Sequence, residues 1–157
     1  MMTNFKQLSE DESQETWDKF YEVFHFKPSP KDFPSITSGK PQLKFDIQDC
    51  FSPDYPFHKL EDFAIALFTK ISKPKDRLYA LDWQHTCYDF DPRLKMDRNE
   101  FGEWEIPVFP NGDYYIFLTK DFENLWFGHP WEQTITLIGD EIVAAARNEK
   151  IDLPIMK

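Results

Sequence analysis

Two short segments concentrate the side chains that could do chemistry. The first is Asp82-Trp83-Gln84-His85, and the second is Gly128-His129-Pro130-Trp131-Glu132. Histidine titrates near neutral pH and is a common zinc ligand. If the two segments meet in a sheet, the two histidines could form an acid–base or metal site with neighbouring carboxylates. The carboxylates that could join them are Asp82, Asp113 and Glu132.

The same residues also have a structural explanation. His129 stands in a Gly–His–Pro turn, where its ring could hydrogen-bond a backbone carbonyl, and Asp82 could cap a loop. If residues 82–85 continue as a strand, Trp83 and His85 share one face, and Asp82 and Gln84 share the other. The spacing matches neither HExxH nor CxxC. We therefore assign no catalytic residue and expect no bound metal or cofactor, while convergence of the two histidines stays open.

Nucleophilic and phosphate-binding chemistry has less support. Cys87 lies two residues from His85, but neighbouring positions of one strand seldom give nucleophile–base geometry. No serine stands in a GxSxG elbow, and five glycines in the whole chain form no phosphate-binding loop. Cys50 and Cys87 are far apart, which favours two reduced thiols in a cytoplasmic protein.

Helical spacing of apolar residues predicts three helices that support these segments. Ser9 can begin a capping box ahead of a helix over residues 10–24, whose aromatic residues recur every three or four positions. A second amphipathic helix covers residues 60–71 and ends before a proline. Asp140 can cap a last helix over residues 141–148.

The remaining apolar segments predict an antiparallel sheet, because they alternate and are separated by turn residues. Turn signals stand at Pro110-Asn111-Gly112 and at Gly128-His129-Pro130. The predicted strands are Trp104–Phe109, Tyr114–Thr119, Leu125–Phe127, Glu132–Ile138, Leu43–Ile47 and parts of Arg77–Phe90. The fold class is therefore α+β: an antiparallel β-sheet meander of about five or six strands with helices packed mainly on one face.

Length and charge narrow the class of protein. A chain of 157 residues is most simply one domain, here residues 1–157 with a loose N-terminal tail at 1–8. Its net charge of −10 disfavours nucleic acid and anionic membranes and favours a basic protein partner. The sequence contains no signal peptide and no apolar run long enough to span a membrane, so we expect a cytoplasmic protein.

Three longer segments of the sequence can be compared with a known protein family. They are LYALDWQHTCYDF at 78–90, VFPNGDYYIFL at 108–118 and FGHPWEQTITLIG at 127–139. Together with the aromatic helix that contains Trp17 and Phe20, they resemble the bacterial domain of unknown function 2716 family. The resemblance implies a small stand-alone bacterial protein. It implies no reaction and no site residue.

A compact, acidic chain without a catalytic signature favours a non-enzymatic protein-binding module of the immunity-protein or antitoxin type. Its expected contact surface is the acidic and aromatic segment 89–105. The alternative is a small enzyme or ligand-binding protein with a pocket near His85 and His129. The candidate binding residues of both hypotheses are Asp82, Trp83, His85, Asp97, Glu100, Glu103, Trp104, Asp113, Tyr115, His129, Trp131 and Glu132.

Overall fold

The computed structural model describes residues 4–26, 36, 38–83, 85–95, 98–149 and 151–156, with the side chain of Phe57 excepted. Within these ranges the chain forms three α-helices, a short 3-10 helix and eight strands. In chain order they are β1 (Phe5–Gln7), α1 (Glu10–Phe24), β2 (Gln42–Asp46), η1 (Gln48–Phe51), α2 (Phe57–Lys70), β3 (Leu78–Asp82), β4 (Tyr88–Phe90), β5 (Tyr115–Thr119), β6 (Leu125–His129), β7 (Thr134–Ile138), α3 (Asp140–Asn148) and β8 (Ile155–Met156).

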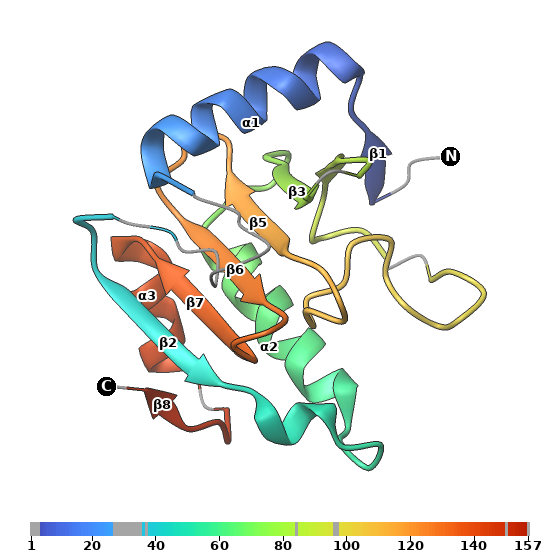
Figure 1. Ribbon diagram of the computed structural model, residues 1–157, viewed down its shortest axis with the longest axis vertical. Helices are drawn as coiled ribbons and strands as arrows, with labels where there is room; N and C mark the ends of the chain where they lie inside the picture. The colour runs from blue at the N-terminus through green and yellow to red at the C-terminus, as the bar shows by residue number, and fades with distance from the viewer. Residues whose placement is uncertain are drawn as a thin grey trace.

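The strands form one sheet in the order β1-β4-β3-β5-β6-β7-β2-β8, and each neighbouring pair is antiparallel. Helices α2 and α3 cover one face, and α1 covers the other (Figure 1). The pleat of β5 separates the two cores, since Phe117 packs with α2 while Ile116 and Leu118 pack with α1. The α+β class and the antiparallel sheet are confirmed, and two of the three helices share a face.

Helix α1 has the predicted bounds because its start and its buried face are both encoded locally. The Ser9 hydroxyl accepts the backbone N–H of Glu12 at 3.2 Å, as a capping residue does. Phe20 and Phe24 are fully buried and pack on each other, and Phe20 also packs on Phe26, which contacts Phe127 of β6. Burial of these rings supplies most of the stability of the helix.

Helix α2 lies against the middle of the sheet. The Phe68 ring stacks on Phe117 of β5 at 4.9 Å and meets Trp126 of β6 edge-on at 5.6 Å. Leu67, one residue earlier, is completely buried. The apolar spacing predicted for residues 60–71 therefore marks the face that contacts the sheet.

Helix α3 begins differently from the prediction, in which Asp140 capped it. Gly139 is the N-terminal cap, and its φ of +129° is one that side chains rarely adopt. The capping oxygen comes from the β5–β6 connection, where Oδ1 of buried Asn124 accepts the N–H of Ile142 at 3.0 Å. A cap supplied from another part of the chain leaves no local sequence signal.

The predicted number of five or six strands is wrong because both ends of the described chain add edge strands. Phe5 pairs with Phe90 and stacks on its ring at 4.7 Å, and the N–H of Leu8 donates to Cys87 at 2.9 Å. Residues 5–8 therefore pair with β4 and the segment before it, which corrects the predicted loose tail at these positions, while residues 1–3 lie outside the described residues. At the opposite edge β8 pairs with β2.

The segment Trp104–Phe109 is not a strand, although its apolar residues alternate. Its buried residues Trp104, Ile106 and Val108 pack on the α2 side of the core. The indole Nε1 of Trp126 donates to the carbonyl of Val108 at 3.3 Å, so a side chain takes the place of a strand partner. The alternation reports burial of one side of an irregular segment.

One of the two predicted turns lies where the sequence placed it, and the other is displaced. The turn at Pro110–Gly112 leads from this irregular segment into β5, with Gly112 at a φ of +86°. Gly128 and His129 belong to β6, and the turn to β7 covers residues 130–133. The β5–β6–β7 meander itself is confirmed.

Candidate functional site

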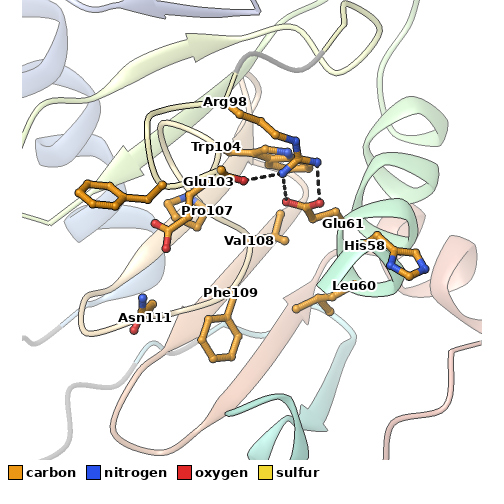
Figure 2. Close-up of a pocket in the computed structure, with 12 residues that line it drawn as sticks. His58, Leu60, Glu61, Arg98, Glu103, Trp104, Pro107, Val108, Phe109 and Asn111 are labelled. Carbon is orange, nitrogen blue, oxygen red and sulfur yellow. Dashed lines mark hydrogen bonds and ion pairs between the residues drawn. The ribbon is translucent and has the colours of Figure 1, made fainter. Parts of the chain in front are cut away.

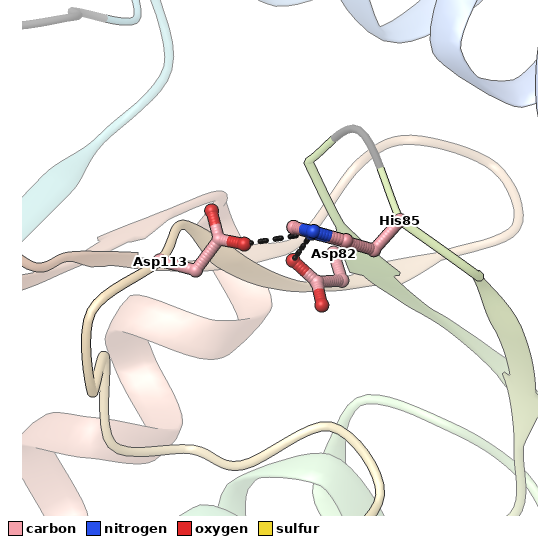
Figure 3. A group of neighbouring side chains, drawn as sticks. All are labelled: Asp82, His85 and Asp113. Atoms are coloured by element: carbon pink, nitrogen blue, oxygen red, sulfur yellow. Dashed lines mark hydrogen bonds and ion pairs between the residues drawn. The ribbon is translucent and has the colours of Figure 1, made fainter.

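Asp82, His85 and Asp113 converge at one end of the sheet (Figure 3). The His85 Nδ1 atom lies 3.2 Å from Oδ1 of Asp82 and 2.9 Å from Oδ2 of Asp113. Strand β3 ends at Asp82, and the backbone N–H of His85 then donates to the carbonyl of Asp82 at 3.1 Å. This turn brings His85 back to Asp82. The prediction that His85 shares a strand face with Trp83 is therefore wrong, and Gln84 lies outside the described residues.

Pairing of β3 with β5 supplies the third member of the cluster. Asp82 is the register partner of Tyr115, and Asp113 lies two residues before Tyr115. Positions two apart point to the same side of an extended chain, so Asp113 and Tyr115 approach Asp82 together. Trp83 and Tyr114 take the opposite face, where their rings meet edge-on at 5.9 Å.

The two carboxylates are largely shielded from solvent, while the imidazole is open. The side chains of Asp82 and Asp113 are 18% and 19% exposed, against 64% for His85. Burial, followed by the hydrogen bond and the negative charge of Asp113, raises the pKa of Asp82 to about 7. The hydrogen bond and charge of Asp82 raise the pKa of His85. The cluster therefore favours retention of a proton or another positive charge between the carboxylates.

Tyr115 borders this cluster on the α2 side of the sheet. Burial, followed by the charges of Asp82 and Asp113, raises the pKa of its phenol to about 12. The phenol thus keeps its proton at neutral pH and can donate a hydrogen bond.

His129 has different surroundings and a structural role. It is 3% exposed, its Nδ1 accepts the backbone N–H of Glu132 at 3.0 Å, and its ring lies edge-on to Tyr114 at 5.0 Å. At Nδ1 the partner is a backbone donor, where the sequence suggested a bond from the ring to a backbone carbonyl. The exposed ring of His85 contacts the shielded carboxylates of Asp82 and Asp113, whereas His129 belongs to the buried aromatic group on the α1 side. The two histidines do not form a shared site.

Glu132 and Trp131 lie within the β6–β7 turn. Glu132 pairs with Lys44 of β2 at 2.8 Å and accepts the Thr134 hydroxyl at 2.7 Å. Burial alone would raise the pKa of Glu132, but these hydrogen bonds and the charge of Lys44 outweigh it and lower the pKa. Trp131 is 53% exposed and meets Tyr114 edge-on at 6.0 Å. The contacts of these two predicted site residues therefore lie at and beside the β6–β7 turn.

A second site is a pocket of about 550 Å³ between α2 and the segment 98–111 (Figure 2). Its wall is fastened by a two-pronged ion pair, in which Arg98 Nη2 lies 2.8 Å from Oε1 of Glu61 and Nη1 lies 3.1 Å from Oε2. The apolar lining includes Leu60, Trp104, Val108 and Phe109. A pocket of this size falls in the range that holds small ligands or a partner's side chains.

Residues 99–103 form a tight turn at the rim of the pocket, which we name the Phe101 turn. Oδ1 of Asn99 accepts the backbone N–H groups of Phe101 at 2.9 Å and Glu103 at 3.0 Å. The N–H of Gly102 donates to the Asn99 carbonyl at 3.0 Å, and Arg98 donates to the Gly102 carbonyl at 2.9 Å. This network holds Phe101 with 77% of its surface exposed.

The candidate binding residues in and beside the Phe101 turn differ in their exposure to solvent. Glu100 and Glu103 are exposed at the Phe101 turn, whereas Trp104 is 2% exposed beneath it. The indole Nε1 of Trp104 has no hydrogen-bond partner among the described residues. Asp97 lies outside the described residues. Sequence reasoning missed Glu61 and Arg98, because a contact across 37 positions leaves no local pattern.

The fold and the two sites define a small acidic α+β protein whose antiparallel sheet lies between helices. Within the described residues, no helix is both long enough and apolar enough to cross a membrane. Residues 7–143 match the family described as "Protein of unknown function (DUF2716)", and the chain belongs to this family. It is similar to the uncharacterized protein YxiI of Bacillus subtilis (strain 168), with 36% identity over 155 residues that cover 94% of this chain and 95% of the relative. No solved structure matches the chain.

Proposed function

We propose that this protein is a non-enzymatic, cytoplasmic binding module of the immunity-protein or antitoxin type. Its partner is a basic protein, and its contact surface is the Phe101 turn with the adjoining pocket. The observation that carries the proposal is the exposed Phe101 ring, held on an ordered turn among carboxylates beside a pocket of about 550 Å³.

Apolar contact area supports a protein partner. Large aromatic side chains are enriched at protein interfaces, where the partner covers them and excludes water. Phe101 is exposed, and Phe51 is 36% exposed while its ring lies 4.5 Å from Phe109 in the pocket wall. A partner could therefore cover Phe101 and insert an apolar side chain toward Phe109 in one contact.

The negative charge of the contact surface predicts a positively charged partner. Glu100, Glu103 and Glu105 are exposed around the buried Trp104, and the whole chain carries a net charge of −10. The positive charge of Arg98 is matched by Glu61, so it does not cancel these three carboxylates. A surface of this kind attracts a basic protein and accelerates the encounter by electrostatic steering.

Rigidity of the surface also favours binding. The hydrogen bonds of Asn99 and the ion pair of Arg98 hold the turn before any partner binds. Less conformational entropy is then lost on association, so more of the contact free energy appears as affinity.

The alternative of an enzyme or ligand-binding pocket near both His85 and His129 has weaker support. His85 contacts two carboxylates at an exposed edge, whereas His129 is buried against Tyr114. A mechanism that uses both rings needs them in one cavity.

The test is a growth-rescue assay in cells that express a basic toxin encoded beside this gene. The wild-type protein should restore growth, and Phe101→Ala or the double change Glu100→Lys with Glu103→Lys should abolish most of the rescue. The matched controls are Trp131→Ala, which removes another exposed aromatic ring, and Glu15→Lys with Glu22→Lys, which reverses two exposed carboxylates on α1 away from its first turn. Full rescue by the Phe101 and charge-reversed variants would exclude this surface. Failure of the wild-type protein to rescue would contradict the immunity role.

A further inference from the structure

We propose that Asp82, His85 and Asp113 bind one divalent transition-metal ion, with zinc as the best match to the ligand set. The site is separate from the Phe101 turn, and the proposal does not depend on the proposed partner. The sequence predicts no metal, because a motif with recognisable spacing is missing. Here the ligands meet through a turn and through strand pairing, which such motifs do not describe.

The distances between the ligand atoms suit a metal ion. One atom from each residue lies within 4.8 Å of the other two, and His85 Nδ1 is 3.2 Å from Asp82 and 2.9 Å from Asp113. With metal–ligand bonds of about 2.1 Å, neighbouring ligands are separated by about 3.0 Å in an octahedral site and about 3.4 Å in a tetrahedral one. The two distances from Nδ1 therefore fit adjacent positions around one ion without a large movement of the chain.

The backbone holds the two carboxylates in position. Asp113 accepts the backbone N–H of Tyr114 through Oδ1 at 2.8 Å, which leaves Oδ2 facing His85. Asp82 is the last residue of β3, and the N–H of Trp83 donates to the carbonyl of Tyr114 at 3.3 Å. Hydrogen bonds that orient ligands in this way raise metal affinity.

The charges of the site require compensation. Asp82 and Asp113 are each more than four-fifths shielded from solvent, so their negative charges need a neighbouring positive charge. A divalent cation would neutralise both carboxylates while the imidazole remains neutral, as a metal ligand must be.

The ligand types select among metals. Mg²⁺ and Ca²⁺ prefer sites made entirely of oxygen, whereas an imidazole nitrogen suits zinc and other transition metals. The His85 side chain is 64% exposed, so solvent can reach the ion. Three protein ligands then leave at least one coordination position for water or for a bound ligand.

The experiment is calorimetric titration of the metal-free, full-length protein with Zn²⁺ and, separately, with Mg²⁺. We expect one equivalent of Zn²⁺ to bind, with much weaker binding of Mg²⁺. His85→Ala and Asp113→Asn should each weaken zinc binding at least tenfold. The matched controls are His58→Ala and Asp54→Asn, which remove an exposed histidine and an exposed carboxylate elsewhere and should leave the affinity unchanged.

The position of the metal site is tested by nuclear magnetic resonance with Mn²⁺ as a paramagnetic probe. The amide signals of residues 82, 83, 85–87 and 113–115 should broaden first, and His85→Ala should remove this selectivity. Unfolding curves recorded without metal should show that each variant is folded. Absence of zinc binding by the wild-type protein would overturn the proposal. Equal zinc affinity of the ligand variants, or broadening centred elsewhere, would also overturn it.

Discussion

Substitution of Asn124 by alanine tests the long-range cap that begins α3. The side chain is 2% exposed, and its Oδ1 accepts the N–H of Ile142, a residue with no exposed surface. Loss of a capping side chain costs about 1 kcal/mol, and a buried donor left without a partner costs about 1–3 kcal/mol. Both costs arise from the same lost hydrogen bond, so they are not added. We expect Asn124→Ala to lower the free energy of unfolding by about 2 kcal/mol. For a chain of this length, that corresponds to a fall in Tm of about 4–8 °C.

The assay is urea unfolding monitored by tryptophan fluorescence, together with a thermal melt by circular dichroism. The matched control is Asn148→Ala at the exposed end of the same helix, which should change stability by less than about 0.5 kcal/mol. An Asn124→Ala midpoint equal to that of the wild-type protein would refute the reasoning. It would mean that another group caps α3.

The remaining predictions concern packing, charge and backbone conformation. Leu67→Ala should lower the free energy of unfolding by about 2–5 kcal/mol, because Leu67 has no exposed surface. An unchanged melting temperature would mean that α2 does not contribute to the core. Glu132→Gln should lower stability by about 0.5 kcal/mol at neutral pH. The pKa of Glu132 in the folded state is below its usual 4.5. The difference in stability between the variant and the wild-type protein should therefore shrink as the pH falls below 4.5 and vanish below the folded-state pKa. Denaturant midpoints measured across pH test this. Gly139→Ala should destabilise strongly, since a Cβ atom would overlap the backbone carbonyl of Glu123; a normal melting temperature would contradict this.

The parts of the fold that the sequence predicts are those whose causes are local. The bounds of α1 follow from the cap at Ser9 and from apolar residues at helical spacing. The segment Trp104–Phe109 was misassigned because alternation reports burial and carries no information about hydrogen-bond partners. The edge strands β1 and β8 are two or three residues long, so their pairing depends on distant partners and leaves almost no pattern.

The candidate site divides in the same way. Residue type was enough to select Asp82, His85 and Asp113, but their meeting depends on the end of β3 and on the β3–β5 register. The same reasoning also selected His129, whose ring is used to order a turn. Arg98 was not selected, because its partner Glu61 lies on a helix that is remote in sequence.

Binding kinetics of the isolated protein and its basic partner test the central claim, that the Phe101 turn is the contact surface. Glu100→Lys with Glu103→Lys should slow association and weaken its dependence on salt, because steering acts on the encounter. Phe101→Ala should accelerate dissociation at least tenfold, about 1.4 kcal/mol, with little effect on association. Association and dissociation rates equal to those of the wild-type protein in both variants would contradict the assignment of this surface.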